Sequence, residues 1–91
     1  MLAEMRPDPD VVSRRLADEV VLVNLRTNRI FALNRSAARF WELFDEGRPR
    51  HEIADALVSE FDVARERVDG EIDGLLSSLR NEGLVAPHAN G

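Results

Sequence analysis

The hydrophobic positions of this chain follow two different periods, and the change from one to the other divides it into two halves. From residue 11 to residue 34 the apolar residues are dense, β-branched and closely spaced, which favours strands over helices. The pattern predicts strands over residues 11–16, 19–25 and 29–33. Asp18 marks the first turn and Arg26-Thr27-Asn28 the second. Two short turns between three strands predict an antiparallel meander.

The second turn decides which side chains share a face of the sheet. Asn28 is the residue best able to adopt positive φ, as a three-residue turn with a bulge requires. The register that follows pairs Val23 with Phe31. One face then carries Val21, Val23, Leu25, Phe31 and Leu33, and the other carries Leu22, Asn24, Ile30 and Ala32.

After residue 34 the apolar residues recur at intervals of three and four, which is typical of helices. The first predicted helix begins at Asn34 or Ser36 as its N-cap and ends before Gly47. The second spans about residues 50–61 and the third about residues 64–82, with Gly83 as its C-terminal cap. The apolar stripe of the third helix consists of Val68, Ile72, Leu75, Leu76 and Leu79.

Three strands followed by three helices predict an α+β domain. The domain would be winged helix-turn-helix-like, with a three-stranded antiparallel meander followed by the three helices. Pro7 and Pro9 disfavour regular structure at the start, so residues 1–9 are expected to form a flexible arm. Residues 10–86 form the domain, and residues 87–91 are expected to form a flexible tail.

Composition narrows the classes of function. The 91 residues suffice for one domain, and the net charge of −5 argues against a nucleic-acid partner. A small winged-helix DNA-binding regulator stays the alternative from another class, but its recognition helix would carry more acidic than basic residues. The chain has no cysteine, no signal-peptide pattern and no apolar run of membrane-spanning length. We therefore expect a cytoplasmic protein with no membrane partner.

Catalytic patterns are missing from the sequence. His51 stands at a helix start and His88 in the tail, and neither has a metal-ligating partner one helical turn away. No nucleophile, zinc-binding or phosphate-loop motif is present. We expect no catalytic residue, no metal and no cofactor, so the protein is not expected to be an enzyme.

Peptide binding fits the predicted fold better. The strand over residues 29–33 ends the sheet, so its outer backbone groups need water or a partner strand. Periodicity places Asp69, Asp73, Leu76 and Arg80 on one flank of the third helix. We predict that this flank packs beside the edge strand and forms a groove with an apolar floor and a charged rim.

Ordered motifs then suggest a family. The stretch VVLVNLRTNRIFALNRSAARFWELFDEG is followed by HEIADALVSEFDV and LLSSLRNEGLV. The set resembles the PqqD-like family in its Thr27-Asn28 turn, its Leu33-Asn34 pair, its Trp41-Glu42-Leu43 motif and its closing Leu79 to Leu84. The resemblance covers about residues 11–86.

The resemblance implies that the chain is a recognition element for ribosomally made, post-translationally modified peptides. Such domains bind the leader of a precursor peptide as a strand added to the third strand, in the cleft against the third helix. A stand-alone domain of this length looks most like the lasso-peptide leader-binding subunit B1, which would work with a separate leader peptidase, B2, and a cyclase. The pyrroloquinoline quinone biosynthesis chaperone is the other candidate.

Periodicity and resemblance together select the candidate peptide-binding residues. We expect apolar pockets between Ile30, Ala32 and Leu76, with basic leader residues meeting Asp69 and Asp73. The full set is Leu22, Arg29, Ile30, Phe31, Ala32, Leu33, Val68, Asp69, Ile72, Asp73, Leu76 and Arg80.

Overall fold

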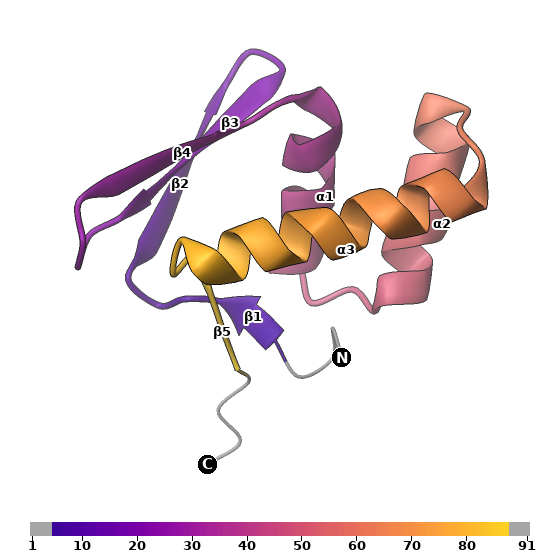
Figure 1. The fold of residues 1–91 in the computed structure, drawn as a ribbon. Coiled ribbons are helices and arrows are strands. Elements are labelled where there is room, and N and C mark those ends of the chain that lie inside the picture. The colour runs from indigo at the N-terminus through magenta and orange to yellow at the C-terminus, as the bar shows by residue number, and fades with distance from the viewer. Residues whose placement is uncertain (1–4, 88–91) are drawn as a thin grey trace.

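The computed structural model describes residues 5–87, so the outer parts of the predicted arm and tail, residues 1–4 and 88–91, lie outside the described chain. The predicted α+β class is confirmed. Strands β2 (Val11–Leu16), β3 (Glu19–Asn24) and β4 (Arg29–Leu33) form an antiparallel sheet in the order β2-β3-β4. Three helices follow, α1 (Arg35–Asp45), α2 (Arg50–Phe61) and α3 (Arg65–Asn81). All three helices lie on one side of the sheet (Figure 1).

The ends of the helices are set by the residues that the sequence indicates. The Asn34 side chain accepts a hydrogen bond from the Ala37 backbone N–H, and it therefore caps α1. Asp62 takes a left-handed conformation, with φ of 54°, and ends α2. Gly83, with φ of 72°, follows α3 and lets the chain turn back. No helix within residues 5–87 is both long and apolar enough to cross a membrane.

The core lies between the sheet and the helices. Phe40 and Phe44 of α1 stack with their ring centroids 5.5 Å apart, and Trp41 lies at 5.6 Å from Phe44. The fully buried apolar side chains include one residue of each of β3, β4, α1 and α2, and two of α3. They are Leu22, Leu33, Phe40, Ile53, Ile72 and Leu79.

The predicted register between β3 and β4 is wrong by one residue. Leu22 pairs with Phe31 and Val23 with Ile30, because four residues rather than three connect the strands. Asn28 does adopt the predicted positive φ, at 61°. A shift of one residue exchanges the faces of a strand. The face toward the helices therefore carries Val20, Leu22, Asn24, Phe31 and Leu33, and the outer face carries Val21, Val23, Ile30 and Ala32.

Residues 5–7, expected to be part of an irregular arm, form a short strand. Strand β1 (Met5–Pro7) pairs antiparallel with β5 (Val85–Pro87), which follows α3. Pro7 stands opposite Val85 at the end of the ladder, a position where proline is tolerated. The two ends of the described chain therefore lie side by side below the sheet (Figure 1).

Candidate functional site

The outer edge of β4 presents unpaired backbone groups. Within residues 5–87, β4 pairs only with β3. The Asn24 carbonyl accepts a hydrogen bond from the Asn28 N–H at 2.7 Å, which shows that Asn24 directs its backbone groups toward β4. Because successive residues of a strand direct these groups to alternate sides, Ile30 and Ala32 present theirs to the open edge. Two residues of β4 are thus available to pair with another strand.

The end of α3 lies beside the start of β4. Arg29 Nη2 and Glu82 Oε1 are 2.8 Å apart, which joins the first residue of β4 to the C-cap of α3. The Arg29 side chain is 63% exposed, so water weakens this ion pair. The ion pair joins the end of α3 to the start of β4.

An apolar pocket lies beyond the other end of β4. A cavity of about 460 Å³ lies where Asn34, the residue after β4, meets the three helices. Its floor is apolar, and Arg67 and Glu71 stand at its rim, joined by an ion pair of 3.1 Å. The apolar lining consists of Ala37, Phe40, Leu57, Phe61, Val63, Val68, Ile72 and Leu75. We call the region between β4 and α3, from the Arg29–Glu82 ion pair to this pocket, the β4–α3 groove.

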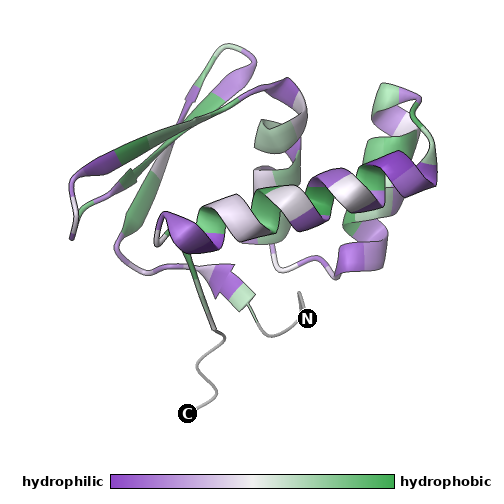
Figure 2. Ribbon diagram, viewed as in Figure 1, coloured by the Kyte–Doolittle hydropathy of each residue, from purple (hydrophilic) through white to green (hydrophobic). Residues whose placement is uncertain are grey.

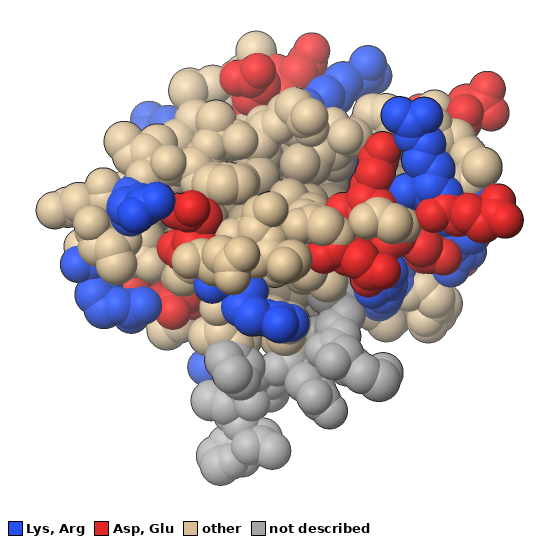
Figure 3. Space-filling model, viewed as in Figure 1, with Lys and Arg blue, Asp and Glu red and all other residues tan. Residues whose placement is uncertain are grey.

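The flank of α3 that the sequence predicts to face β4 instead makes contacts with α2 and β1. Arg50, at the start of α2, forms an ion pair of 2.7 Å with Asp73 and donates a hydrogen bond to the Asp69 carbonyl at 3.0 Å. Arg80 lies near the sulfur of Met5, at 3.8 Å. These side chains therefore point toward α2 and β1, away from β4. Acidic atoms gather at one end of α3 in Figure 3, an uncharged stretch covers its middle, and charged atoms appear again at its other end.

The opposite flank of α3 faces the groove. Leu75 and Glu71 line the pocket, and Glu82 reaches β4. Leu75 belongs to the predicted apolar stripe, but periodicity gives no reason to prefer its side of the stripe over that of Leu76. Phe61 and Val63, on either side of the α2 C-cap, are half-buried pocket residues that the sequence reasoning missed. The available signal in the sequence was that Phe61 and Val63 are two apolar residues on either side of the turn residue Asp62.

The remaining predicted site residues differ in their surroundings. Leu22 and Leu33 are buried at 0% and 1% exposure, so they support the groove from inside the core and cannot contact a peptide. Val68 and Ile72 line the pocket, and Phe31 is half-buried on the helix-facing side of β4. Leu76 is buried on the other flank. Ile30, 70% exposed, lies on the outer face, where the predicted pocket with Leu76 does not form.

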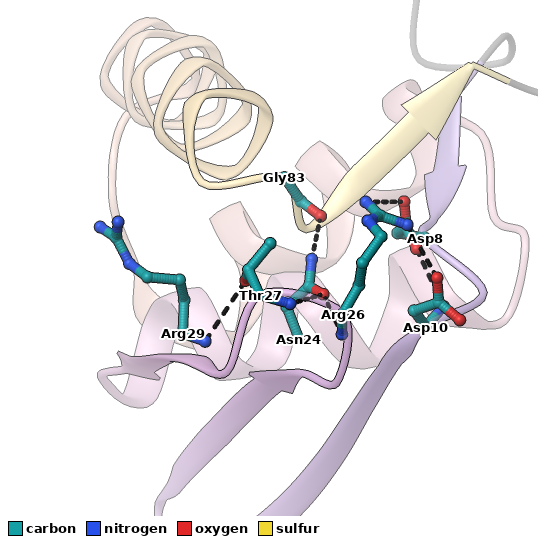
Figure 4. Close-up of polar contacts among 7 residues, drawn as sticks. All are labelled: Asp8, Asp10, Asn24, Arg26, Thr27, Arg29 and Gly83. Atoms are coloured by element: carbon teal, nitrogen blue, oxygen red, sulfur yellow. Dashed lines mark hydrogen bonds and ion pairs between the residues drawn. The ribbon is translucent and has the colours of Figure 1, made fainter.

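One buried amide fixes the hairpin tip against the end of α3. The Asn24 side chain is fully buried, and its Nδ2 donates to the Gly83 carbonyl at 2.8 Å. Its Oδ1 accepts from the Arg26 N–H at 2.9 Å and from the Thr27 N–H at 3.2 Å (Figure 4). Both polar atoms of this buried amide thus have hydrogen-bond partners. The spacing between β4 and α3 depends on this connection.

Arg26 adds a second connection at the hairpin tip. Its guanidinium forms ion pairs with Asp10 at 2.7 Å and with Asp8 at 3.4 Å (Figure 4). Asp8 is 9% exposed, and its backbone N–H donates to the Leu84 carbonyl. The hairpin tip, the segment before β2 and the segment after α3 are therefore held together at one end of the groove.

Comparison with known proteins shows the family to which the chain belongs. A family model described as coenzyme PQQ synthesis protein D (PqqD) matches residues 19–85. A solved structure described as TbiB1 in complex with the TbiA(beta) leader peptide is 35% identical, with a TM-score of 0.87 over 93% of this chain and 99% of that one. Another, lasso peptide synthetase B1 complexed with the leader peptide, is 27% identical, with a TM-score of 0.84 over 92% of this chain and 99% of that one. Comparison with curated protein sequences gives no match. The chain belongs to the PqqD family.

Proposed function

We propose that this protein binds the leader segment of a ribosomally made precursor peptide in the β4–α3 groove. The open edge of β4 beside an apolar pocket is the observation that carries this proposal. An extended peptide could pair with the backbone of Ile30 and Ala32 and place side chains in the pocket. The two B1 structures are complexes with leader peptides, which supports the same ligand class for this chain.

Strand pairing alone would not hold the leader. Ordering about ten peptide residues costs on the order of 10 kcal/mol, whereas each backbone hydrogen bond returns only about 1 kcal/mol net. Burial of an apolar leader side chain returns about 2 kcal/mol. The pocket lined by Phe61, Val63 and Leu75 is the apolar surface that could supply this contribution.

The charges around the groove are better suited to setting the register of the leader than to increasing its affinity. Arg29 and Glu82 stand at one end of the groove, and Arg67 and Glu71 at the other. All four are partly or fully exposed, so each contact with a charged leader residue would contribute little energy. Such pairs at a rim would nevertheless favour one alignment of the leader over its neighbours.

In this proposal the protein performs no chemistry itself. It binds the leader in the cytoplasm and raises the local concentration of the precursor at a separate leader peptidase and, in a lasso pathway, a cyclase. A lasso pathway is favoured because the two B1 structures align over nearly the full length of both chains. The family description favours a second candidate, a peptide chaperone of pyrroloquinoline quinone biosynthesis. Both candidates share the peptide-binding site.

A calorimetric titration tests the proposal. The probe is the synthetic leader of the short precursor peptide encoded beside this protein's gene, with the TbiA(beta) leader as a second probe. A peptide of scrambled sequence and a DNA duplex are the controls. We expect a Kd near or below about 1 μM for the leader, and no binding to either control. Binding to the duplex without binding to a leader would instead identify a winged-helix regulator.

A further inference from the structure

A second cavity, which is polar, adjoins the apolar pocket where β4 leads into α1. It has a volume of about 240 Å³ and lies between the turn after β2, the first half of α1 and the end of α2. Figure 2 shows the chain changing from apolar to hydrophilic residues as it passes from β4 into α1. Phe61 lines both cavities, so they meet at its ring. The other lining residues of the polar cavity are all charged: Arg15, Asp18, Arg35, Arg39, Glu42 and Glu60.

Most of these charges are paired with one another. Arg39 Nε lies 2.9 Å from Glu60 Oε1, and Arg39 Nη1 lies 3.2 Å from Glu42 Oε1. Glu42 also forms an ion pair with Arg15. These contacts join α1 to the end of α2 and to β2. Their role is therefore structural, and the two glutamates leave no unpaired negative charge beside α1.

Arg35, the first residue of α1, is held differently. Its Cζ lies over the ring of Phe61, 5.4 Å from the ring centroid, which is a cation–π contact. No carboxylate of residues 5–87 lies within 4.0 Å of its guanidinium nitrogens. A guanidinium stacked on a ring uses its face, and its N–H donors in the plane remain available for a carboxylate. Arg35 thus presents a fixed but unpaired cation at the boundary of the two cavities.

The other two arginines near the groove already have carboxylate partners. Arg29 is paired with Glu82, and Arg67 is paired with Glu71. An acidic leader residue would have to compete with these partners, whereas it could bind Arg35 without displacing an ion pair. Arg35 is also close along the chain, because it follows the last residue of β4 by two positions. A leader strand advances about 3.3 Å per residue, so it would reach Arg35 shortly after it leaves β4.

We propose that Arg35 is a subsite for an acidic side chain of the leader, one or two residues beyond the segment that pairs with β4. The inference rests on the proposed function and deepens it, because it names the chemistry of a leader residue and the group that binds it. The net charge of the protein is −5, so an acidic leader residue is repelled over most of the surface. Arg35 therefore favours the alignment that brings this residue to the end of β4.

A double-mutant cycle tests the subsite. The probes are the synthetic leader of the short precursor peptide encoded beside this protein's gene and analogues in which each Asp or Glu is replaced singly by Asn or Gln. Each peptide is titrated by calorimetry against the unchanged protein, Arg35→Gln and Arg14→Gln. Arg14 is exposed on the side of β2 away from the helices, so it is the matched control for the loss of one positive charge. Thermal unfolding verifies that both variants are folded.

We expect Arg35→Gln to lower the affinity for the leader about fivefold, and Arg14→Gln to keep it within about twofold. One leader analogue should show the same loss with the unchanged protein and no further loss with Arg35→Gln. Full affinity in Arg35→Gln, or losses that multiply for every analogue, would overturn the subsite while leaving leader binding intact. Tight binding of a leader that has no acidic residue would also overturn it. Failure of the unchanged protein to bind the leader would instead count against the proposed function.

Discussion

Strands β2 and β4 are both edges of the same sheet, but their surroundings differ. Beside β2 lies a polar cavity of about 240 Å³ whose lining includes Arg15, Asp18 and Arg39. Beyond the end of β4, at Asn34, lies the apolar pocket of about 460 Å³. The Val11 N–H on the outer edge of β2 already donates to the Asp8 carbonyl, whereas β4 has no partner on its outer side within residues 5–87.

The comparison teaches that an open edge is not sufficient for peptide binding. A strand added to β2 would gain backbone hydrogen bonds but little apolar burial, and such bonds do not offset the entropy of ordering a peptide. A strand added to β4 would gain both. The structure therefore predicts one peptide-binding edge out of two that are geometrically alike.

The largest expected effect comes from removing the outward N–H of β4. Ile30→Pro deletes a donor on the open edge, and the proline ring obstructs an incoming strand. Proline is tolerated on an edge strand where the N–H faces solvent. We expect leader affinity to fall on the order of a hundredfold, measured by calorimetry with the fold checked by circular dichroism.

Ser13→Pro is the matched control for this substitution. Ser13 is exposed, and alternation from the Leu25 N–H, which donates to the Asp10 carbonyl, directs the Ser13 backbone to the outer edge of β2. Its leader affinity should equal that of the unchanged protein. Comparable losses of leader affinity in both variants would mean that the leader does not bind selectively at the β4 edge.

The next effect distinguishes the two flanks of α3. Leu75→Asp places a charge in the pocket, and we expect it to cost about 2 kcal/mol of binding free energy, or about thirtyfold in affinity. Leu75 is half-buried, so the domain should remain folded. Titration with the leader measures this loss, and unchanged affinity in the folded variant would remove the pocket from the site.

Leu76→Asp provides the contrast. Leu76 is 8% exposed and packs on the flank away from β4, so its substitution should lower the melting temperature rather than act on the groove. The pocket that the sequence predicts between Ile30, Ala32 and Leu76 would instead make this variant a folded protein that cannot bind the leader. Thermal unfolding of the two variants separates the interpretations.

The difference between these two leucines shows what the sequence could and could not predict. Periodicity correctly identifies the buried stripe of α3, and local signals correctly predict the α1 cap at Asn34 and the bounds of α2. The flank that faces β4 depends on how α3 packs against distant elements, such as the Arg50 contacts with Asp69 and Asp73. Those contacts leave no trace in helical periodicity.

The register error has a similar origin. Asn28 carries a local signal for positive φ, and that signal is correct. Asn24 turns inward and bonds to Gly83, 59 residues away, and four loop residues separate it from the start of β4. A polar residue in a strand normally predicts an exposed position, so nothing in the sequence indicates that Asn24 is buried. Strands β1 and β5 were missed because Pro7 and Pro87 argue against strands.

Substitution of Asn24 should have a smaller effect, on both the stability of the domain and its affinity for the leader. Asn24→Ala leaves the Gly83 carbonyl and two turn N–H groups without their buried partner. We expect a loss of about 2 kcal/mol in the free energy of unfolding, measured by urea denaturation. The leader affinity should fall more in this variant than in a variant of equal stability altered near β2, because the hairpin tip sets the spacing between β4 and α3.

The smallest effect concerns the ion pair at the end of the groove. Glu82→Gln removes the charge that faces Arg29 while keeping the side chain's size. Both groups are partly exposed, so the expected change in affinity is about twofold. The change should shrink further in titrations at higher salt, where exposed ion pairs are screened. A loss as large as that of Ile30→Pro would contradict the assignment of binding energy to the strand edge and the pocket.

Amide hydrogen exchange by NMR, with and without the leader, tests the central claim most directly. The account predicts that the N–H groups of Ile30 and Ala32 exchange quickly in the free protein and slowly in the complex. Those of Ser13 and Arg15 on β2 should exchange at the same rate in both states. Slowed exchange at Ser13 and Arg15, or unchanged exchange at Ile30 and Ala32 in a saturated complex, would contradict leader binding at the β4 edge.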